Sequence, residues 1–298
     1  MGGVGRTENV DKREDVIKVN GGRIAYAVRG TAVPGGTAGP GGAAGPRVPA
    51  TAILLIMGLG IPGSGWDRQA YALAKEFTVV TYDNRGTGAS DPAPMGYSID
   101  AMAADAIGVL DHLGIARAHV VGISMGGFIA QTIALDHPER VDRLVLCSTA
   151  FGGPEQVSAS SDVLADLAGF GPPDRTPEER LRRRLRINFG EDFINRHPAE
   201  VRSFLESADR MPVAEGTRMV HLLASAEFDR SADVARITVP TLVMAGTDDI
   251  LVPPENSRLL AARIPGARLL FYQGAGHSFI FERAREFNRD VAAFLKGL

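Results

Sequence analysis

The sequence predicts an α/β protein in which helices cover both faces of a mostly parallel sheet. Short apolar segments without strict polar alternation recur along the chain, as expected of strands that are buried on both faces. Segments with helical periodicity alternate with these strands, and this alternation is typical of parallel crossover units. The 298 residues, 45% of them hydrophobic, suffice for one large core with a smaller inserted segment.

The N-terminal segments predict an antiparallel hairpin at one edge of the sheet. Residues 1–14 are polar and predict a flexible tail. Residues 15–20 and 23–30 have the composition of strands, and Gly21-Gly22 predicts a tight turn between them. Residues 31–50 are dominated by Gly, Pro, Ala and Thr. Because so little of this segment can be buried, we expect a mobile loop.

The core domain is expected to comprise residues 15–150 and 231–298. Its further strands are predicted at 51–57, 78–83, 118–123, 143–148, 241–246 and 268–273, and its helices at 65–77, 98–114, 125–136, 254–264 and 281–298. The segment at 98–114 has the pattern of an amphipathic helix. Met102, Ile107 and Leu110 recur at helical spacing, and Gly114 is suited to end the helix.

The alternation stops between residues 151 and 230, where about four helices and no strand are expected. Parallel sheets bind ligands at the carboxyl ends of their strands, and the strand at 143–148 ends where this segment begins. We therefore expect residues 151–230 to form a helical lid on the functional side of the sheet.

Composition and charge narrow the class of protein. The net charge of −3 and the 22% of charged residues do not indicate the basic face of a nucleic-acid-binding protein. The single cysteine, Cys147, lies in an apolar run and predicts a buried thiol, so no disulfide forms within the chain. No apolar stretch approaches the roughly 20 residues of a membrane helix, and the N-terminus has no secretory signal. We expect a cytoplasmic protein whose partner is a small-molecule substrate rather than nucleic acid or membrane, and a homo-oligomer is compatible with the sequence.

The segment VGISMGG at 121–127 carries the strongest functional signal. Gly122, Ser124 and Gly126 form a Gly-x-Ser-x-Gly pattern that follows a predicted strand and opens a predicted helix. A turn this sharp exposes the serine, and small flanking residues are needed because the two backbones approach closely. Ser124 is therefore the predicted nucleophile, and an ordinary turn serine is the alternative.

A serine nucleophile needs a base and an acid that orients the base. Among six histidines, His277 lies in the loop after the strand at 268–273, at the same edge of the sheet as Ser124, and is the predicted base. Asp248 and Asp249 directly follow the strand at 241–246. Asp249 is preferred as the acid, and Asp248 is assigned to the turn. Such a triad requires no metal and no organic cofactor.

The tetrahedral oxyanion formed on this serine would need hydrogen-bond donors. The backbone amides of Met125, directly after the nucleophile, and of Leu59, in the glycine-rich loop at 57–66, are predicted to supply them. Trp66 and His221 are candidates for the edge of the pocket. The alternative for Trp66 is packing in the core, and the alternative for His221 is a solvated position or one in which its ring is hydrogen-bonded within the protein. Most apolar residues of the expected lid should form its core and a few should line an apolar pocket: Phe151, Phe170, Phe189, Phe193, Phe204, Met211, Met219 and Leu222.

Taken together, these segments resemble the α/β-hydrolase superfamily. The resemblance rests on LLIMGLG at 54–60, DNRGTGAS at 83–90, VGISMGG at 121–127, HPERVDRLVLCST at 137–149, the stretch from Gly246 to Pro253, and GAGHSF at 274–279. It implies an α/β-hydrolase fold and a structural role for Asp83 and Arg85. In similar proteins the acid stands three residues after the strand-end glycine and four before a proline, as Asp249 does here. Relatives often have His-Gly in the oxyanion loop, whereas this chain has Met57-Gly58.

Within that superfamily the chain resembles serine esterases and lactonases, including enol-lactonase-like and polyketide methylesterase-like members. The expected function is hydrolysis of a carboxylic ester or lactone of a small, largely apolar molecule through an acyl-enzyme. Two alternatives stay open. The same triad can serve a non-hydrolytic or C–C bond-changing step in a biosynthetic pathway, or the fold can act as a small-molecule receptor. Incorporation of solvent oxygen separates the first alternative from hydrolysis, and tight retention of the ligand would indicate the second.

Overall fold

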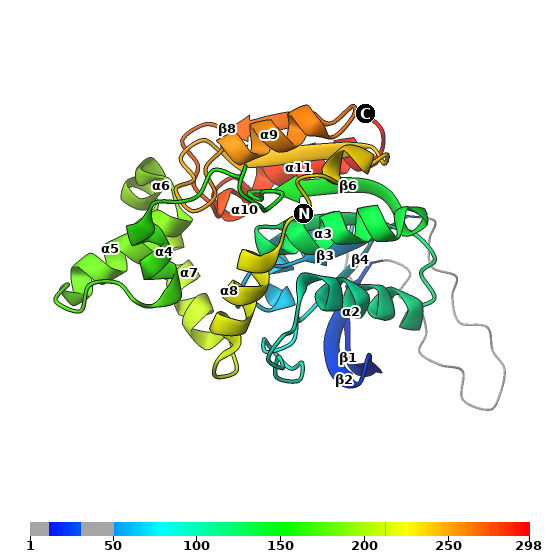
Figure 1. The fold of residues 1–298 in the computed structure, drawn as a ribbon, viewed down its shortest axis with the longest axis horizontal. Helices are drawn as coiled ribbons and strands as arrows, with labels where there is room; N and C mark the ends of the chain where they lie inside the picture. The colour runs from blue at the N-terminus through cyan, green and yellow to red at the C-terminus, as the bar shows by residue number, and fades with distance from the viewer. Residues whose placement is uncertain (1–11, 31–50, 212) are drawn as a thin grey trace, which may run out of the picture.

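The computed structural model describes residues 12–30, 51–211 and 213–298, so the predicted loop at 31–50 and residues 1–11 of the predicted tail lie outside it. One eight-stranded sheet with the order β1-β2-β4-β3-β5-β6-β7-β8 runs through this part of the chain (Figure 1). Its strands are β1 (Lys12–Val19), β2 (Gly22–Arg29), β3 (Ala52–Ile56), β4 (Thr78–Tyr82), β5 (Ala118–Ile123), β6 (Val141–Cys147), β7 (Thr241–Gly246) and β8 (Arg268–Tyr272).

Strand pairing confirms the predicted fold class. The strands from β4 to β8 in the sheet order pair in parallel, whereas β1 pairs antiparallel with β2, and β2 pairs antiparallel with β4. The hairpin turn is formed by Asn20 and Gly21, with φ of 46° and 78°, rather than by Gly21-Gly22 as predicted. Two consecutive positive φ angles match the twist of a two-residue hairpin, so Gly22 is free to begin β2. Strand β1 begins at Lys12, within the predicted tail.

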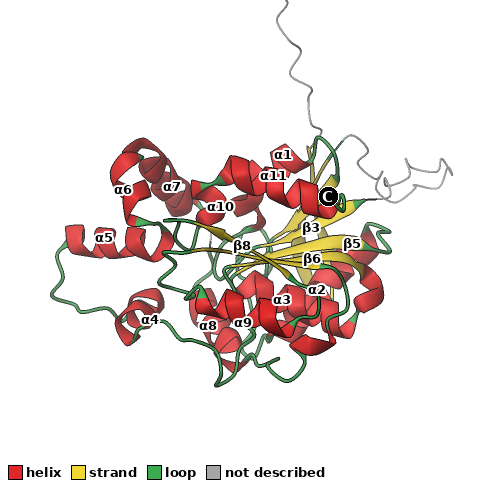
Figure 2. Cartoon of the chain, turned by 90° about the horizontal axis from the view of Figure 1, so that it is seen from above, coloured by secondary structure: helices red, strands yellow, loops and turns green. Residues whose placement is uncertain are grey.

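Helices cover both faces of the sheet (Figure 2). Helices α1 (Asp67–Leu73) and α11 (Ala284–Leu295) pack on one face, and α2 (Ile99–His112), α3 (Met125–Asp136) and α9 (Glu255–Arg263) pack on the other. The short helix α10 (Phe279–Glu282) and the 3₁₀ turns η1 (Gly63–Trp66), η2 (Pro138–Arg140) and η3 (Val234–Arg236) complete the core. Cys147 lies fully buried in β6, and burial raises the pKa of its thiol.

In the described residues between β6 and β7 the chain forms five α-helices, where about four helices were predicted. They are α4 (Ser161–Ala168), α5 (Pro177–Asn188), α6 (Glu191–Arg196), α7 (Pro198–Arg210) and α8 (Thr217–Glu227), and we call this segment the helical insertion. Pro198 separates α6 from α7, because a proline lacks the amide that would continue the preceding helix. Helices α4 to α7 extend beyond the edge of the sheet, and Leu185, Phe189, Phe193 and Val201 form a small core of their own (Figure 1).

The turn at 83–90 holds neighbouring loops in place through hydrogen bonds, which is the structural role that the resemblance implies. Asp83 accepts hydrogen bonds from the Gly63 and Ala89 amides at 2.8 and 2.9 Å. The buried Arg85 guanidinium forms a bidentate pair with Asp105 at 2.7 and 2.8 Å. The turn is therefore rigid, because each charged side chain has its partners inside the protein. In the described part of the chain, no helix has the length and apolar character needed to cross a membrane.

Candidate active site

Ser124 sits on a strained turn between β5 and α3. Its φ of 55° and ψ of −124° are unfavourable for a residue with a Cβ atom, and this geometry turns the side chain out of the sheet. The flanking glycines are required by contact distance. A Cβ atom on Gly122 would lie 2.1 Å from the Gly126 carbonyl oxygen, and one on Gly126 would lie 2.3 Å from the Ile56 carbonyl oxygen. The Ser124 backbone is held by its amide, which donates to the Cys147 carbonyl at 2.9 Å.

Asp249 and His277 are brought together from two loops at the carboxyl ends of β7 and β8. His277 Nδ1 lies 2.8 Å from Asp249 Oδ2. Since a carboxylate can only accept, the Nδ1 atom carries the proton and the Nε2 atom of the neutral ring is left as an acceptor. The other carboxylate oxygen accepts from the Leu251 and Val252 amides at 2.9 and 2.8 Å, which fixes the orientation of Asp249.

Asp248, the alternative acid, points elsewhere. Its amide donates to the Ala275 carbonyl at 2.9 Å, and its Oδ1 accepts from the Thr247 hydroxyl at 3.2 Å. Asp248 therefore closes the turn beside the site, and Asp249 is the carboxylate that contacts the imidazole.

The loop at 57–66 runs directly against the serine. A Cβ atom on Gly58 would lie 3.2 Å from the Ser124 Cβ, so only a glycine lets the loop approach this closely. Among the described residues, the Leu59 amide donates no hydrogen bond, and Met125 is the first residue of α3, where the amide has no intrahelical acceptor. The backbone amides of Leu59 and Met125, the two donors predicted from the sequence, are thus available beside Ser124.

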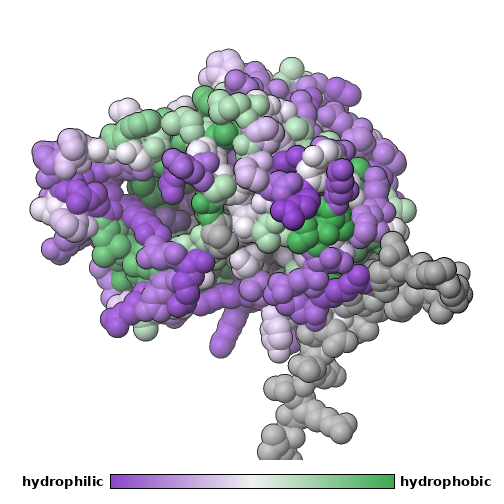
Figure 3. Space-filling model, turned by 90° about the horizontal axis from the view of Figure 1, so that it is seen from below, coloured by the Kyte–Doolittle hydropathy of each residue, from purple (hydrophilic) through white to green (hydrophobic). Residues whose placement is uncertain are grey.

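Ser124, His277, Leu59 and Met125 all line one cavity of about 1240 Å³ between the sheet and the helical insertion. Figure 3 shows a hollow on the side of the insertion, with hydrophobic residues inside it and hydrophilic residues around it. Of the apolar residues proposed for the lid, Phe204, Met211 and Leu222 line the cavity. The lining surface is mainly apolar, as predicted, and arginines contribute to its polar part: Arg68, Arg175, Arg180, Arg183, Arg184, Arg210 and Arg218.

The two residues proposed for the edge of the pocket do not line this cavity. Trp66 is fully buried in the core, where its ring stacks on Phe287 with centroids 6.0 Å apart. His221 is also fully buried, and its ring nitrogens contact the Gly60 amide and the Arg85 carbonyl. Both side chains are enclosed by protein on all sides, so the prediction that they edge the pocket is wrong.

Glu282 is a functional candidate that the sequence did not reveal. Its Oε1 accepts from the Gly276 amide at 2.7 Å, next to His277, and its carboxylate also accepts from the Gly190 amide in the helical insertion at 3.3 Å. Burial outweighs these bonds and raises the pKa of Glu282 to about 7. Its position in a charged helical segment, FERAREF, gave no sign of this role.

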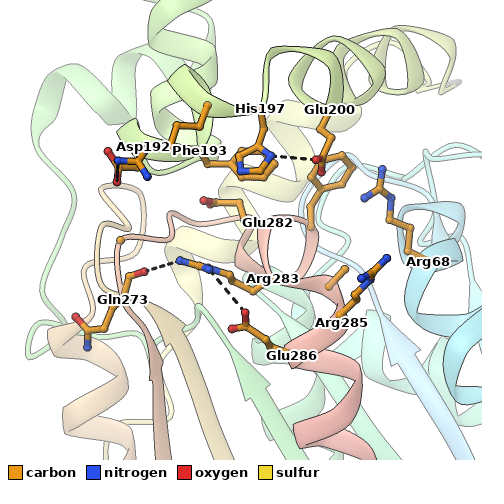
Figure 4. A pocket seen from close by; sticks show the side chains of 14 residues that line it. Arg68, Asp192, Phe193, His197, Glu200, Gln273, Glu282, Arg283, Arg285 and Glu286 are labelled. Carbon is orange, nitrogen blue, oxygen red and sulfur yellow. Dashed lines mark hydrogen bonds and ion pairs between the residues drawn. The ribbon is translucent and has the colours of Figure 1, made fainter.

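Figure 4 shows Glu282 at the boundary between the insertion and the C-terminal helices, with His197 and Glu200 on one side and Arg283 and Glu286 on the other. These residues line a second, smaller cavity of about 550 Å³. Ser124 and His277 do not line it, whereas Arg68 and Phe281 line both cavities. No group of three or more His, Cys, Asp or Glu side chains in the described ranges is arranged to hold a metal ion.

The parallel sheet and the serine turn at its edge define an enzyme of the α/β hydrolase class. The chain belongs to the α/β hydrolase fold family, whose model matches residues 51–284. It is 34% identical over 249 residues to a putative carbamate hydrolase RutD of Caulobacter vibrioides, covering 82% of this chain and 90% of that protein. A putative carbamate hydrolase RutD of Pseudomonas savastanoi pv. phaseolicola is also 34% identical, over 83% of this chain and 95% of the relative.

Two solved structures show the same fold at somewhat lower identity. The enol-lactonase from Burkholderia xenovorans LB400 is 30% identical with a TM-score of 0.74, covering 95% of this chain and 100% of that one. A hydrolase from Pseudomonas aeruginosa PA01 is 29% identical with a TM-score of 0.76, covering 97% and 99%. These likenesses confirm the resemblance drawn from the sequence motifs.

Proposed function

We propose that this hydrolase cleaves a carboxylic ester or lactone of a small molecule, with Ser124, His277 and Asp249 as a catalytic triad. The observation that carries the proposal is the 2.8 Å contact between His277 Nδ1 and Asp249 Oδ2 on the cavity that Ser124 also lines. That contact leaves Nε2 of the imidazole free to act as a base.

In the first half-reaction, His277 Nε2 takes the proton of the Ser124 hydroxyl while the oxygen attacks the substrate carbonyl carbon. The resulting tetrahedral intermediate carries a negative oxygen. When it collapses, the bond to the leaving alkoxide breaks, and His277 returns the proton to the alkoxide. An ester of Ser124 remains.

In the second half-reaction, His277 deprotonates a water that attacks the acyl carbon, and Ser124 leaves with the returned proton. The product is a carboxylic acid, and a lactone gives a single hydroxy acid. The Leu59 and Met125 amides would stabilise the oxyanion in both halves, since the first has no other acceptor and the second begins a helix. Asp249 would stabilise the imidazolium, held in place by its two backbone donors.

A carbamate is the second candidate substrate class. The relatives named putative carbamate hydrolase are 34% identical over more than four fifths of this chain. The same attack on a carbonyl carbon would apply, with the C–O or C–N bond of the carbamate breaking in place of the ester bond. The cavity wall is mainly apolar but also carries arginines that could contact the polar carbamate group.

The test compares Ser124→Ala with Ser203→Ala, which alters an exposed serine on α7 that lies outside the cavity lining. The wild type should turn over p-nitrophenyl butyrate and be labelled at Ser124 by a fluorophosphonate. S124A should lose about 10³-fold or more in kcat and all labelling, and S203A should keep both.

Substrate class is then resolved with a panel of esters, lactones and carbamates in ¹⁸O-water. Hydrolysis places one solvent oxygen in the acid product. Labelling of S124A by the fluorophosphonate at the wild-type level, or turnover by S124A, would contradict the proposal. If the wild type hydrolyses carbamates but neither esters nor lactones, the second candidate is favoured.

A further inference from the structure

His221 of helix α8 is fully buried, and both of its ring nitrogens are engaged. Nδ1 accepts a hydrogen bond from the Gly60 amide at 3.2 Å, and Nε2 lies 3.0 Å from the Arg85 carbonyl oxygen. Because a carbonyl oxygen can only accept, Nε2 carries the proton and Nδ1 holds the lone pair. This pattern requires the neutral ring in a single tautomer, and burial supports it by lowering the pKa of His221.

One partner of the ring, the Arg85 carbonyl, belongs to a rigid part of the structure. The Arg85 carbonyl lies in the turn at 83–90, whose guanidinium is fixed on Asp105. The start of α8 is fastened to the same turn, because the Thr217 hydroxyl and the Ala214 amide both donate to the Gly86 carbonyl, at 3.1 and 2.8 Å. His221 therefore has a fixed position from which to hold a second group.

The other partner belongs to a loop with few restraints of its own. Gly60 has a φ of 66° and directly follows Leu59, the proposed oxyanion donor. Within the loop, the Ile61 amide reaches the Gly58 carbonyl only at 3.4 Å. Core side chains hold the loop's two ends, with Asn84 on the Met57 carbonyl and Asp83 on the Gly63 amide. Between these ends, the Gly60 amide donates to His221 Nδ1. Among the described residues, this is the hydrogen bond that connects the middle of the loop to another element.

We infer that His221 is a positioning residue, which holds the 58–61 loop so that the Leu59 amide faces the reacting carbonyl. The inference rests on the proposed function. It assigns a role in the reaction to a side chain of the helical insertion that lies outside the cavity and touches no substrate. A misplaced donor would weaken binding of the oxyanion and leave binding of the ground-state substrate largely unchanged.

Three substitutions separate the two hydrogen bonds of the ring. In His221→Asn, the side-chain oxygen occupies roughly the place of Nδ1 and can accept from Gly60, but nothing reaches Arg85. In His221→Gln, the longer side chain reaches the place of Nε2 and can donate to Arg85, while the Gly60 contact is lost. His221→Phe keeps a ring of similar size and removes both contacts.

With p-nitrophenyl butyrate, we expect H221N to keep kcat within about threefold of the wild type. H221Q and H221F should lose about 10- to 100-fold in kcat with KM within about twofold, which is less than the loss of a whole oxyanion donor. Affinity for butylboronic acid, whose serine adduct mimics the tetrahedral intermediate, should fall by the same factor as kcat.

Equal kcat values for H221N and H221Q, or a loss confined to KM or to the melting temperature, would overturn the inference. If H221F does not fold, the comparison of H221N with H221Q decides the matter alone. A wild-type chain that shows no turnover, or an S124A variant that retains it, would overturn the proposed function and this inference with it. If the wild type is active and the His221 variants have the same kcat as the wild type, only the inference about His221 is overturned and the proposed function stands.

Discussion

His277 Nδ1 and Asp249 Oδ2 lie 2.8 Å apart, and the second oxygen of Asp249 accepts from two backbone amides. The carboxylate is thus held by the loop that follows β7 and in turn holds the imidazole from the loop that follows β8. An acid fixed in this way selects one tautomer of the histidine, and in the proposed mechanism it would favour the imidazolium.

The first prediction tests which aspartate supports the histidine. Asp249→Asn should lower kcat by about 10³- to 10⁴-fold with little change in KM, because an amide facing Nδ1 can stabilise the wrong tautomer. Asp248→Asn should stay within about threefold of the wild type, since its side chain accepts from the Thr247 hydroxyl in the turn and does not contact His277. Steady-state kinetics on both variants measure this, and a larger loss in D248N than in D249N would contradict the assignment.

The second prediction concerns the serine turn. Gly122→Ala should lower the free energy of unfolding by about 3 kcal/mol or more, because the new Cβ atom would meet the Gly126 carbonyl at 2.1 Å. Gly114→Ala is the matched control. Its φ is 67° but no atom lies within 4 Å of the added methyl, so only backbone strain of about 1–2 kcal/mol is expected. Urea denaturation gives both values, and equal losses would refute steric crowding at the turn.

The third prediction concerns pH and Glu282. Its folded-state pKa is raised from 4.5 to about 7, so the folded protein holds this proton more tightly than the unfolded chain. Stability from this group is therefore fully present below pH 4.5 and is lost as the pH rises through about 7. In Glu282→Gln the amide oxygen can still accept from Gly276, but no group titrates.

The stability of E282Q relative to the wild type should therefore increase between pH 4.5 and 7, by up to about 3 kcal/mol, and stay constant above that range. Chemical denaturation at a series of pH values measures the difference. S203A, which changes no titrating group, should follow the wild-type curve. A pH-independent difference between E282Q and the wild type would show that Glu282 does not titrate in this range.

Local patterns in the sequence predicted much of the fold. The apolar runs that became β3 to β7 were recognisable because a strand buried on both faces needs apolar residues at nearly every position. The serine turn was recognisable because its glycines are dictated by contacts within a few residues of Ser124. The turn was misplaced by one residue because two neighbouring glycines allowed two registers. The start of β1 was placed three residues late because Lys12, Arg13 and Glu14 are charged, although they pair with β2.

The sequence by itself determined the order of strands and helices, the serine turn and the loops that carry Leu59, Asp249 and His277, since each depends on residues close together in the chain. Only the tertiary structure decided that Asp249 rather than Asp248 contacts the histidine, that Trp66 and His221 lie inside the protein, and that Glu282 supports the loop of His277. The physical reason is distance along the chain. His221 lies 161 residues from the glycine it holds, and no local periodicity encodes which side chains meet when separate elements pack.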